Sequence, residues 1–161
     1  MYEIGDKIVY PKYGAGIIES IVEKKIGNAK VKYYTLIMPG NSVKVLLPVD
    51  KCDELSVRRV MTSDEAKKIL EYFRDVPLPD DSGWNRRHRE NIEKIRSGDI
   101  FEIVTVLKKL MYIDRFKGLS TSERKMFISV REIIVSELVL SGIADRENIY
   151  NIMDDVVSKE L

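Results

Sequence analysis

Short runs of β-branched and aromatic residues fill the first third of the chain and are typical of strands. These runs lie at residues 7–10, 16–23, 31–37 and 43–47. Turn-forming pairs, Gly27-Asn28 and Pro39-Gly40, separate the later runs, and the two glycines of residues 14–16 lie between the first two. This pattern predicts a small, strongly bent antiparallel β-barrel within residues 1–60.

From residue 62 onward, apolar residues recur every three or four positions, as in amphipathic helices. Thr62 and Ser120 each precede a glutamate by three residues, a capping box that opens a helix. The expected helices run from Thr62 to about Arg74, from Trp84 to Ser97, and over residues 100–117, 120–141 and 149–157. A linker at residues 77–81 separates the first two helices. We therefore predict an α+β, multidomain fold in which a barrel at 1–60 precedes a compact all-α bundle at 61–161.

Charge is distributed unevenly along the 161 residues, although the net charge is only +1. Residues 84–131 carry 12 basic and 6 acidic side chains, whereas residues 132–161 carry 2 basic and 7 acidic ones. A basic segment followed by an acidic one indicates a nucleic-acid surface, although ordinary helices show the same asymmetry.

Catalytic and metal-binding patterns are absent from the sequence. One histidine and one cysteine cannot form a multi-histidine or cysteine-rich metal site, and no glycine-rich phosphate loop precedes a helix. We expect no enzyme activity, no cofactor and no metal. His88 could be a metal ligand or an acid, but its arginine neighbours favour a surface residue that faces phosphate. Cys52 is interpreted as a small apolar filler.

The lone thiol and the lack of a secretory signal favour a reducing compartment, and no apolar run approaches the roughly 18 residues that span a bilayer. We expect a cytoplasmic, nucleoid-associated protein without membrane contact. No coiled-coil seam predicts a dimer, so a monomer is expected.

The only tryptophan, Trp84, lies at the start of the second predicted helix, among arginines. Proteins that enter the minor groove of DNA combine cationic phosphate contacts with an apolar side chain that pries at a base step. The alternative interpretation is that Trp84 packs onto its own domain and fixes the helix start, because large aromatic residues are often buried.

Three segments together resemble the CarD/CdnL family of bacterial transcription regulators. They are residues 5–16 (GDKIVYPKYGAG), residues 84–89 (WNRRHR) and residues 118–126 (GLSTSERKM). The resemblance covers nearly the whole chain, and the first segment is also similar to the polymerase-binding module of transcription-repair coupling factors. The resemblance to the CarD/CdnL family implies that the barrel is Tudor-like and docks on the β subunit of RNA polymerase, while the helical domain contacts promoter DNA.

The same resemblance implies roles for individual residues. The tryptophan would wedge into the minor groove at the edge of the melted promoter, basic residues would hold the phosphate backbone without reading sequence, and open complexes would live longer. The candidate DNA-binding residues are Trp84, Arg86, Arg87, Arg89 and Lys125.

The candidate polymerase-binding residues are Pro11, Lys24, Lys25 and Lys44. Some relatives have an arginine two residues before Pro48, where this chain has Leu46, and this departure bears on the strength of docking. The alternative is that the three lysines form an ordinary solvated face.

Three hypotheses from different classes follow. The first is a non-enzymatic transcription factor bound to RNA polymerase. The second is a free-standing, sequence-tolerant DNA-binding protein whose affinity falls steeply with salt. The third is a protein-interaction scaffold in which Trp84 belongs to the core.

Overall fold

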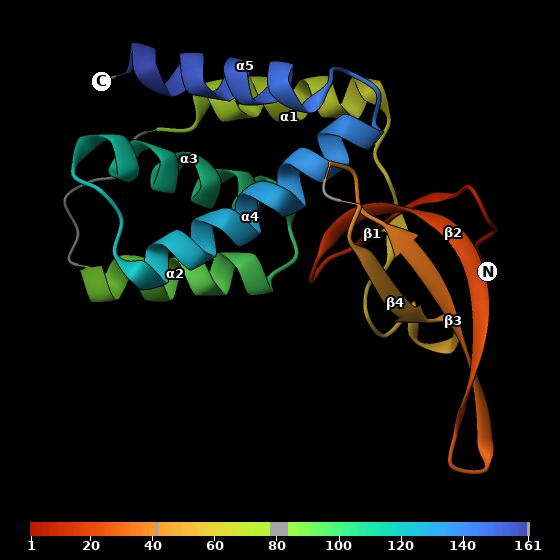
Figure 1. The fold of residues 1–161 in the computed structure, drawn as a ribbon. Coiled ribbons are helices and arrows are strands. Elements are labelled where there is room, and N and C mark those ends of the chain that lie inside the picture. Colours follow the sequence, from red (N-terminus) through yellow and green to blue (C-terminus); the bar gives the residue numbers. More distant parts are fainter. Residues whose placement is uncertain (41, 78–83, 161) are drawn as a thin grey trace.

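A computed structural model describes residues 1–40, 42–77 and 84–160. It contains an antiparallel sheet that adjoins a bundle of helices (Figure 1). The strands are β1 (Lys7–Tyr10), β2 (Gly14–Ile26), β3 (Ala29–Ile37), β4 (Lys44–Pro48) and β5 (Arg58–Arg59), with a 3-10 helix, η1 (Val49–Lys51), after β4. The helices are α1 (Ser63–Asp75), α2 (Trp84–Arg96), α3 (Ile100–Phe116), α4 (Thr121–Leu140) and α5 (Arg146–Lys159).

The sheet is open, so the predicted β-barrel is not confirmed. Its strand order is β4-β3-β2-β1-β5, and no pairing joins β4 to β5 in the part of the chain that the structure describes. Because β5 has only two residues, Arg58 and Arg59, both of which pair with β1, it offers too short an edge to close the sheet. The predicted bend is nevertheless present, and a β-bulge between Ile18 and Ser20 contributes to it.

The predicted strands are confirmed, with two differences. The segment from Gly14 to Gly16 opens β2 instead of forming a turn, because the turn comes earlier and is closed by Tyr13 N–H donating to the Tyr10 carbonyl over 2.8 Å. No sequence pattern indicated β5, since two consecutive arginines lack any apolar alternation.

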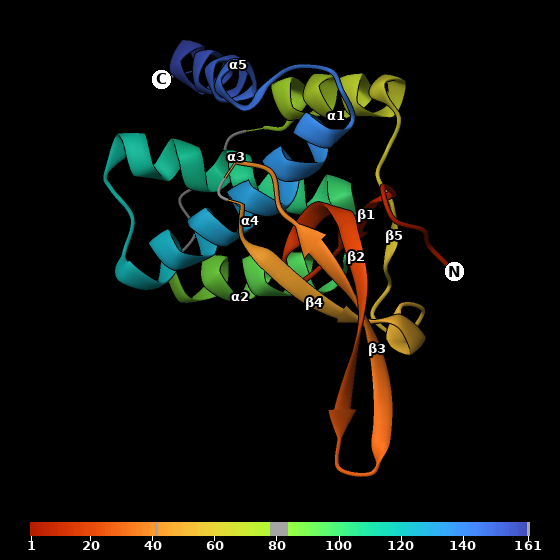
Figure 2. The ribbon, with the colours of Figure 1, turned by 45° about the vertical axis from the view of Figure 1, so that its right-hand side comes forward.

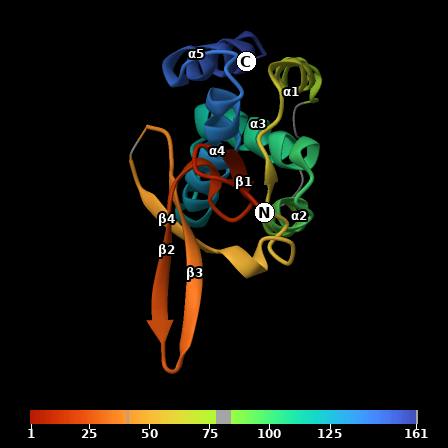
Figure 3. The same cartoon turned by 90° about the vertical axis from the view of Figure 1, so that its right-hand side faces the viewer.

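The β2–β3 hairpin is the most extended feature of the sheet. Its strands pair as far as Ile26 and Ala29, and Gly27 at the turn has φ +61°. Figures 2 and 3 show the hairpin projecting from the body of the molecule. Residues 23–30 are all exposed, so this tip packs against nothing in the described part of the chain.

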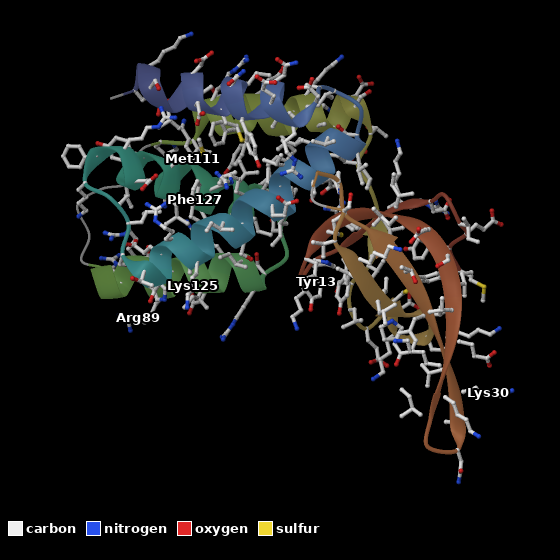
Figure 4. All side chains as sticks on the ribbon, viewed as in Figure 1. Tyr13, Lys30, Arg89, Met111, Lys125 and Phe127 are labelled. Atoms are coloured by element: carbon white, nitrogen blue, oxygen red, sulfur yellow. The ribbon has the colours of Figure 1, made fainter. Side chains whose placement is uncertain are left out.

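The five predicted helices are confirmed, and both capping boxes form as expected, at Thr62–Glu65 and Ser120–Glu123. Helix α3 contacts each of the other four helices. Met111 of α3 and Phe127 of α4 point between their helices into the core (Figure 4). In Figures 1 and 2, α1 and α5 lie at one end of the bundle and α2 at the other.

The sheet has its own core, formed by Ile8, Ile18, Tyr34, Leu36, Met38, Leu47 and Cys52. Cys52 is buried there as predicted, and its thiol lies 3.6 Å from the carbonyl of Pro48. None of the described helices is both long and apolar enough to cross a membrane.

Candidate functional site

The start of α2 carries most of the candidate DNA-binding residues. Trp84 is the first residue of this helix, as predicted. Its side chain and residues 78–81 of the predicted linker lie outside the described part of the structure. The wedge and core interpretations of Trp84 therefore both stay predictions.

Arg86 and Arg89 lie on the exposed side of α2. The Arg86 guanidinium pairs with Glu90 one turn later, at 2.9 Å, and its side chain is 73% exposed. Such surface pairs contribute no more than about 0.5 kcal/mol, so Arg86 can exchange Glu90 for a phosphate at little cost. Arg89 has no ion pair with any described residue.

Arg87 is buried, whereas a residue that contacts DNA is expected to be exposed. Its side chain is only 9% exposed, and its guanidinium pairs with Glu123 of α4 at 3.1 Å. Glu123 is also the capping-box residue of α4 and bonds to Ser120. Arg87 thus ties the first turn of α2 to the first turn of α4. The sequence held a signal for this, because Arg87, Asn91 and Ile95 are spaced four residues apart on one helical face.

Lys125 lies at the start of α4, two residues after Glu123. Its side chain is exposed and has no ion pair with any described residue. Figure 4 shows Arg89 and Lys125 on the same side of the bundle, at α2 and the beginning of α4. We call Arg86, Arg89 and Lys125 the cationic surface. Its charges point outward, as a phosphate-binding surface requires.

The basic excess of residues 84–131 overstates the charge available at the surface. Lys108 is fully buried, and its ammonium donates to the carbonyls of Arg74 and Val76 and pairs with Glu160 at 3.0 Å. In the sequence, Lys108 is one of the 12 basic residues of this segment, and its buried role is not apparent from the charge pattern. Its position amid the apolar residues of α3 was the available signal.

Lys24 and Lys44 share one face of the sheet, opposite to its core. Tyr34 and Leu36 face the core, so the alternate β3 residues Val31 and Ile37 face outward, and these pair with Lys24 and Lys44. Lys25 pairs with Lys30 and therefore faces the other way. The two adjacent lysines of the candidate set are thus separated by the sheet.

The outward face is partly apolar. Leu46 lies there, 40% exposed, opposite Thr35 and one pleat along from Lys44. Lys44 pairs with Glu19 at 3.3 Å, and both side chains are well exposed, so the pair is weak. We call Lys24, Lys44 and Leu46 the outer sheet face.

Pro11 lies apart from the outer sheet face. It is half-buried in the turn between β1 and β2 and lines a cleft of about 740 Å³ with Arg58, Arg96 and Ile133. This cleft lies between the sheet and the helices, so Pro11 is grouped with neither candidate surface.

The histidine and the cysteine of the chain show no features of a metal or catalytic site in the described part of the structure. His88 is half-buried on α2. Among the residues that the structure describes, no group of three or more histidine, cysteine, aspartate or glutamate side chains could hold a metal ion. Burial raises the pKa of the Cys52 thiol above its usual value, so this cysteine is mostly protonated near neutral pH.

Comparisons with known proteins match both parts of the chain. Residues 2–61 match the family model described as the CarD-like/TRCF RID domain, and residues 68–154 match the CarD C-terminal domain. The Bacillus subtilis (strain 168) protein named "Putative transcription factor YdeB" is 37% identical over 152 residues, which cover 91% of this chain and 97% of that relative.

Proposed function

We propose that this chain, which belongs to the CarD-like family of transcription factors, bridges RNA polymerase and promoter DNA and stabilises the open complex. The observation that carries the proposal is the presence of both family domains in one chain, each with its own exposed candidate surface. Figure 4 shows Lys30 on the hairpin and Arg89 on α2 at opposite ends of the molecule. One chain can therefore contact two large partners at once.

The polymerase-binding part of the proposal rests on the sheet. Its outer face carries Lys44 beside the exposed Leu46, and Lys24 lies on the same face farther out along the hairpin. Cations next to an apolar residue suit a partner surface that combines carboxylates with an apolar patch. Strand β4 is an edge strand in the described sheet, so its backbone can also accept a further strand from a partner. Leu46 makes this contact more apolar than the arginine of some relatives would. We propose the polymerase β subunit as the partner.

The DNA-binding part rests on the cationic surface. Arg86, Arg89 and Lys125 would bind phosphates, which positions the protein without reading sequence. Trp84 begins the same helix, so phosphate contacts by Arg86 and Arg89 would bring it to a groove edge. We propose that Trp84 enters the minor groove and stabilises an unstacked base step.

The proposed stabilisation of the open complex follows from the coupling between protein binding and promoter melting. A protein that binds the melted promoter more tightly than the closed duplex shifts the equilibrium toward the melted form by the difference in binding free energy. A difference of about 1.4 kcal/mol that is absent from the transition state of closing lengthens the lifetime of the open complex about tenfold. No catalytic group is needed for this effect.

The test is the lifetime of open complexes formed by the cognate RNA polymerase, measured after addition of a competitor. It compares no protein, wild type, Trp84→Ala and the control Phe101→Ala. Phe101 is also an aromatic residue near a helix start, is 44% exposed and packs only edge-on against Tyr72 at 5.0 Å. We expect wild type and Phe101→Ala to lengthen the lifetime and Trp84→Ala to do so far less.

Two results would contradict the proposal. Equal lifetimes with and without the wild-type protein would remove open-complex stabilisation as the function. A large fall in the melting temperature of Trp84→Ala would instead place Trp84 in the core and favour the scaffold hypothesis.

A further inference from the structure

We propose that the Arg58–Glu137 ion pair is a positioning contact that holds the sheet and the helices in one orientation, so that the chain acts as a rigid bridge. The functional consequence rests on the function proposed above. The structural part, a fixed orientation of the two halves, stands independently of it.

The pair joins β5 to the last turn of α4. The Arg58 guanidinium donates two bonds to the Glu137 carboxylate of α4, at 2.6 and 2.7 Å. The same carboxylate accepts the backbone N–H of Met61 at 2.9 Å, just before α1 begins. The Glu137 side chain is 1% exposed, so its charge depends on these donors. Three segments therefore meet at one carboxylate.

A second attachment lies at the start of β2. Ala15 N–H donates to the hydroxyl of Ser136, the neighbour of Glu137, at 2.9 Å. Gly14 approaches α4 so closely that a Cβ there would lie 2.6 Å from the Ser136 hydroxyl and 3.2 Å from Cα of Ile133. The backbone of this strand thus lies close against α4, and the Ser136 hydroxyl bridges the two.

A third attachment lies at the connection between β3 and β4. Arg146 of α5 donates to the carbonyl of Pro39 at 2.8 Å while it pairs with Glu132 of α4 at 2.9 Å. Hydrogen bonds to Glu132 and Tyr150 raise the pKa of Arg146 further above its already high value, so it stays charged. Its side chain also packs against Gly40.

These three attachments involve different parts of the sheet: β5, the start of β2 and the β3–β4 connection. One attachment would leave a hinge, but three that do not lie along one strand restrict rotation about every axis. Relative motion is the default for two domains in one chain unless their interface prevents it. Of the three, Arg58–Glu137 contributes the most completely buried charge.

A fixed orientation matters because one proposed binding surface lies on the sheet and the other on α2 and α4. When one surface is bound, a rigid connection holds the other at a high effective concentration beside its partner. A flexible connection would lose part of that advantage as conformational entropy. We therefore expect that loosening the junction weakens bridging while each surface still binds its own partner.

The test measures the orientation directly by electron paramagnetic resonance distances between two spin labels. The labels are placed at Asn28→Cys on the hairpin tip and Asn151→Cys on α5, both exposed positions, in a Cys52→Ser background. Arg58→Ala is compared with Arg59→Ala, its neighbour in β5, whose pair with Asp6 spans 3.4 Å at the surface. We expect a narrow distance distribution in wild type and Arg59→Ala, and a roughly doubled width in Arg58→Ala.

The functional readout uses the same substitutions in the unlabelled chain. We expect Arg58→Ala to shorten the open-complex lifetime by roughly threefold or more relative to Arg59→Ala, with unchanged affinity for the isolated polymerase β fragment. If Arg58→Ala does not fold, Arg58→Lys takes its place, because it keeps the charge but not the two parallel donors. Arg58→Lys should broaden the distribution by less.

The two measurements test the structural role of Arg58 and its functional consequence separately. An unchanged distance distribution in the substituted protein would overturn the positioning role of Arg58. A broadened distribution with a full open-complex lifetime would overturn the rigid-bridge consequence. If the wild-type protein itself leaves the lifetime unchanged, the proposed function fails, and the distance measurement still decides the role of the ion pair.

Discussion

The guanidinium of Arg87 on α2 lies 3.1 Å from the carboxylate of Glu123 on α4, and both side chains are almost completely buried. Glu123 also closes the capping box of α4 with Ser120. The pair therefore fixes the first turn of α2, which contains Trp84 and Arg86 and precedes Arg89. Arg87, a candidate DNA-binding residue, thus also has a structural role at the start of this helix.

Replacing Arg87 should destabilise the fold much more than replacing its neighbour. Arg87→Ala leaves the Glu123 carboxylate buried without this partner, and we expect a loss of roughly 3 kcal/mol in the free energy of unfolding. Arg86→Ala removes a surface pair and should change it by less than about 0.5 kcal/mol. Urea unfolding monitored by circular dichroism measures both. Equal stability of the two variants would contradict a buried, structural Arg87.

The cationic surface predicts how DNA affinity depends on salt. Arg89→Ala and Lys125→Ala should each weaken binding to any duplex alike and reduce the slope of log K against log salt by about 1. Lys32→Ala is the matched control, because Lys32 is an exposed cation on the hairpin. Fluorescence anisotropy at several low salt concentrations gives the slopes. A loss of slope in Lys32→Ala as large as in Arg89→Ala would place the DNA contact elsewhere.

The sheet register separates two adjacent lysines that the sequence grouped together. Lys24 lies on the outer sheet face with Lys44, whereas Lys25 lies on the opposite face. We expect Lys24→Glu and Lys44→Glu to weaken binding to the polymerase β subunit, about tenfold if each costs 1.4 kcal/mol, and Lys25→Glu to weaken it less. Surface plasmon resonance with an immobilised β fragment measures this order. The reverse order would assign docking to the other face.

The Cys52 thiol should react slowly in the native protein. Burial raises its pKa above its usual value, so the reactive thiolate is scarce near neutral pH and becomes common only as the pH approaches the native pKa. Because this pKa is higher in the native state than in the unfolded chain, the thiol contributes stability that is fully present below the unfolded pKa and is lost as the pH rises through the native pKa. An alkylation series from pH 7 to 10 tests this.

An exposed thiol supplies the comparison for Cys52. Asn28→Cys in the Cys52→Ser background places a cysteine at the hairpin tip, where it should react at the rate of a free thiol. Urea should accelerate alkylation of Cys52 but leave the Asn28→Cys rate nearly unchanged. Similar native rates for both cysteines would mean that Cys52 is accessible.

Much of the fold follows from local patterns in the sequence. The two capping boxes and the apolar periodicity predicted the helices. Runs of β-branched and aromatic residues separated by glycine turns predicted four of the strands. These signals are local, because they depend on residues three or four apart. Sheet closure is not local, and the two arginines of β5 showed neither that they form a strand nor that one of them reaches α4.

The candidate site was predicted less completely than the fold. Arg86, Arg89 and Lys125 are exposed, and their contact with DNA stays a prediction. Composition alone cannot distinguish such exposed cations from a buried one such as Arg87. That distinction depends on a carboxylate 36 residues away in the sequence. Long-range pairing of this kind leaves no trace in local charge counts.

Lys108 gives the last prediction and shows the same long-range effect. Its ammonium donates to the carbonyls of Arg74 and Val76 at the end of α1, at 2.9 and 2.7 Å, and pairs with Glu160. A cation there satisfies carbonyls that have no partner within the helix and also favours the negative end of its dipole. Lys108→Met keeps most of the unbranched apolar stem of the side chain but removes the ammonium and with it all three bonds.

We therefore expect Lys108→Met to lower the free energy of unfolding by about 2 to 4 kcal/mol, because a buried carbonyl is left without a donor. Lys117 is an exposed lysine just after α3, the helix that carries Lys108. Lys117→Met should change the free energy of unfolding by less than about 0.5 kcal/mol. Hydrogen exchange should also accelerate at the end of α1 in Lys108→Met. Unchanged stability and exchange would mean that the ammonium contributes nothing there, and that burial of the apolar stem alone keeps Lys108 inside the bundle.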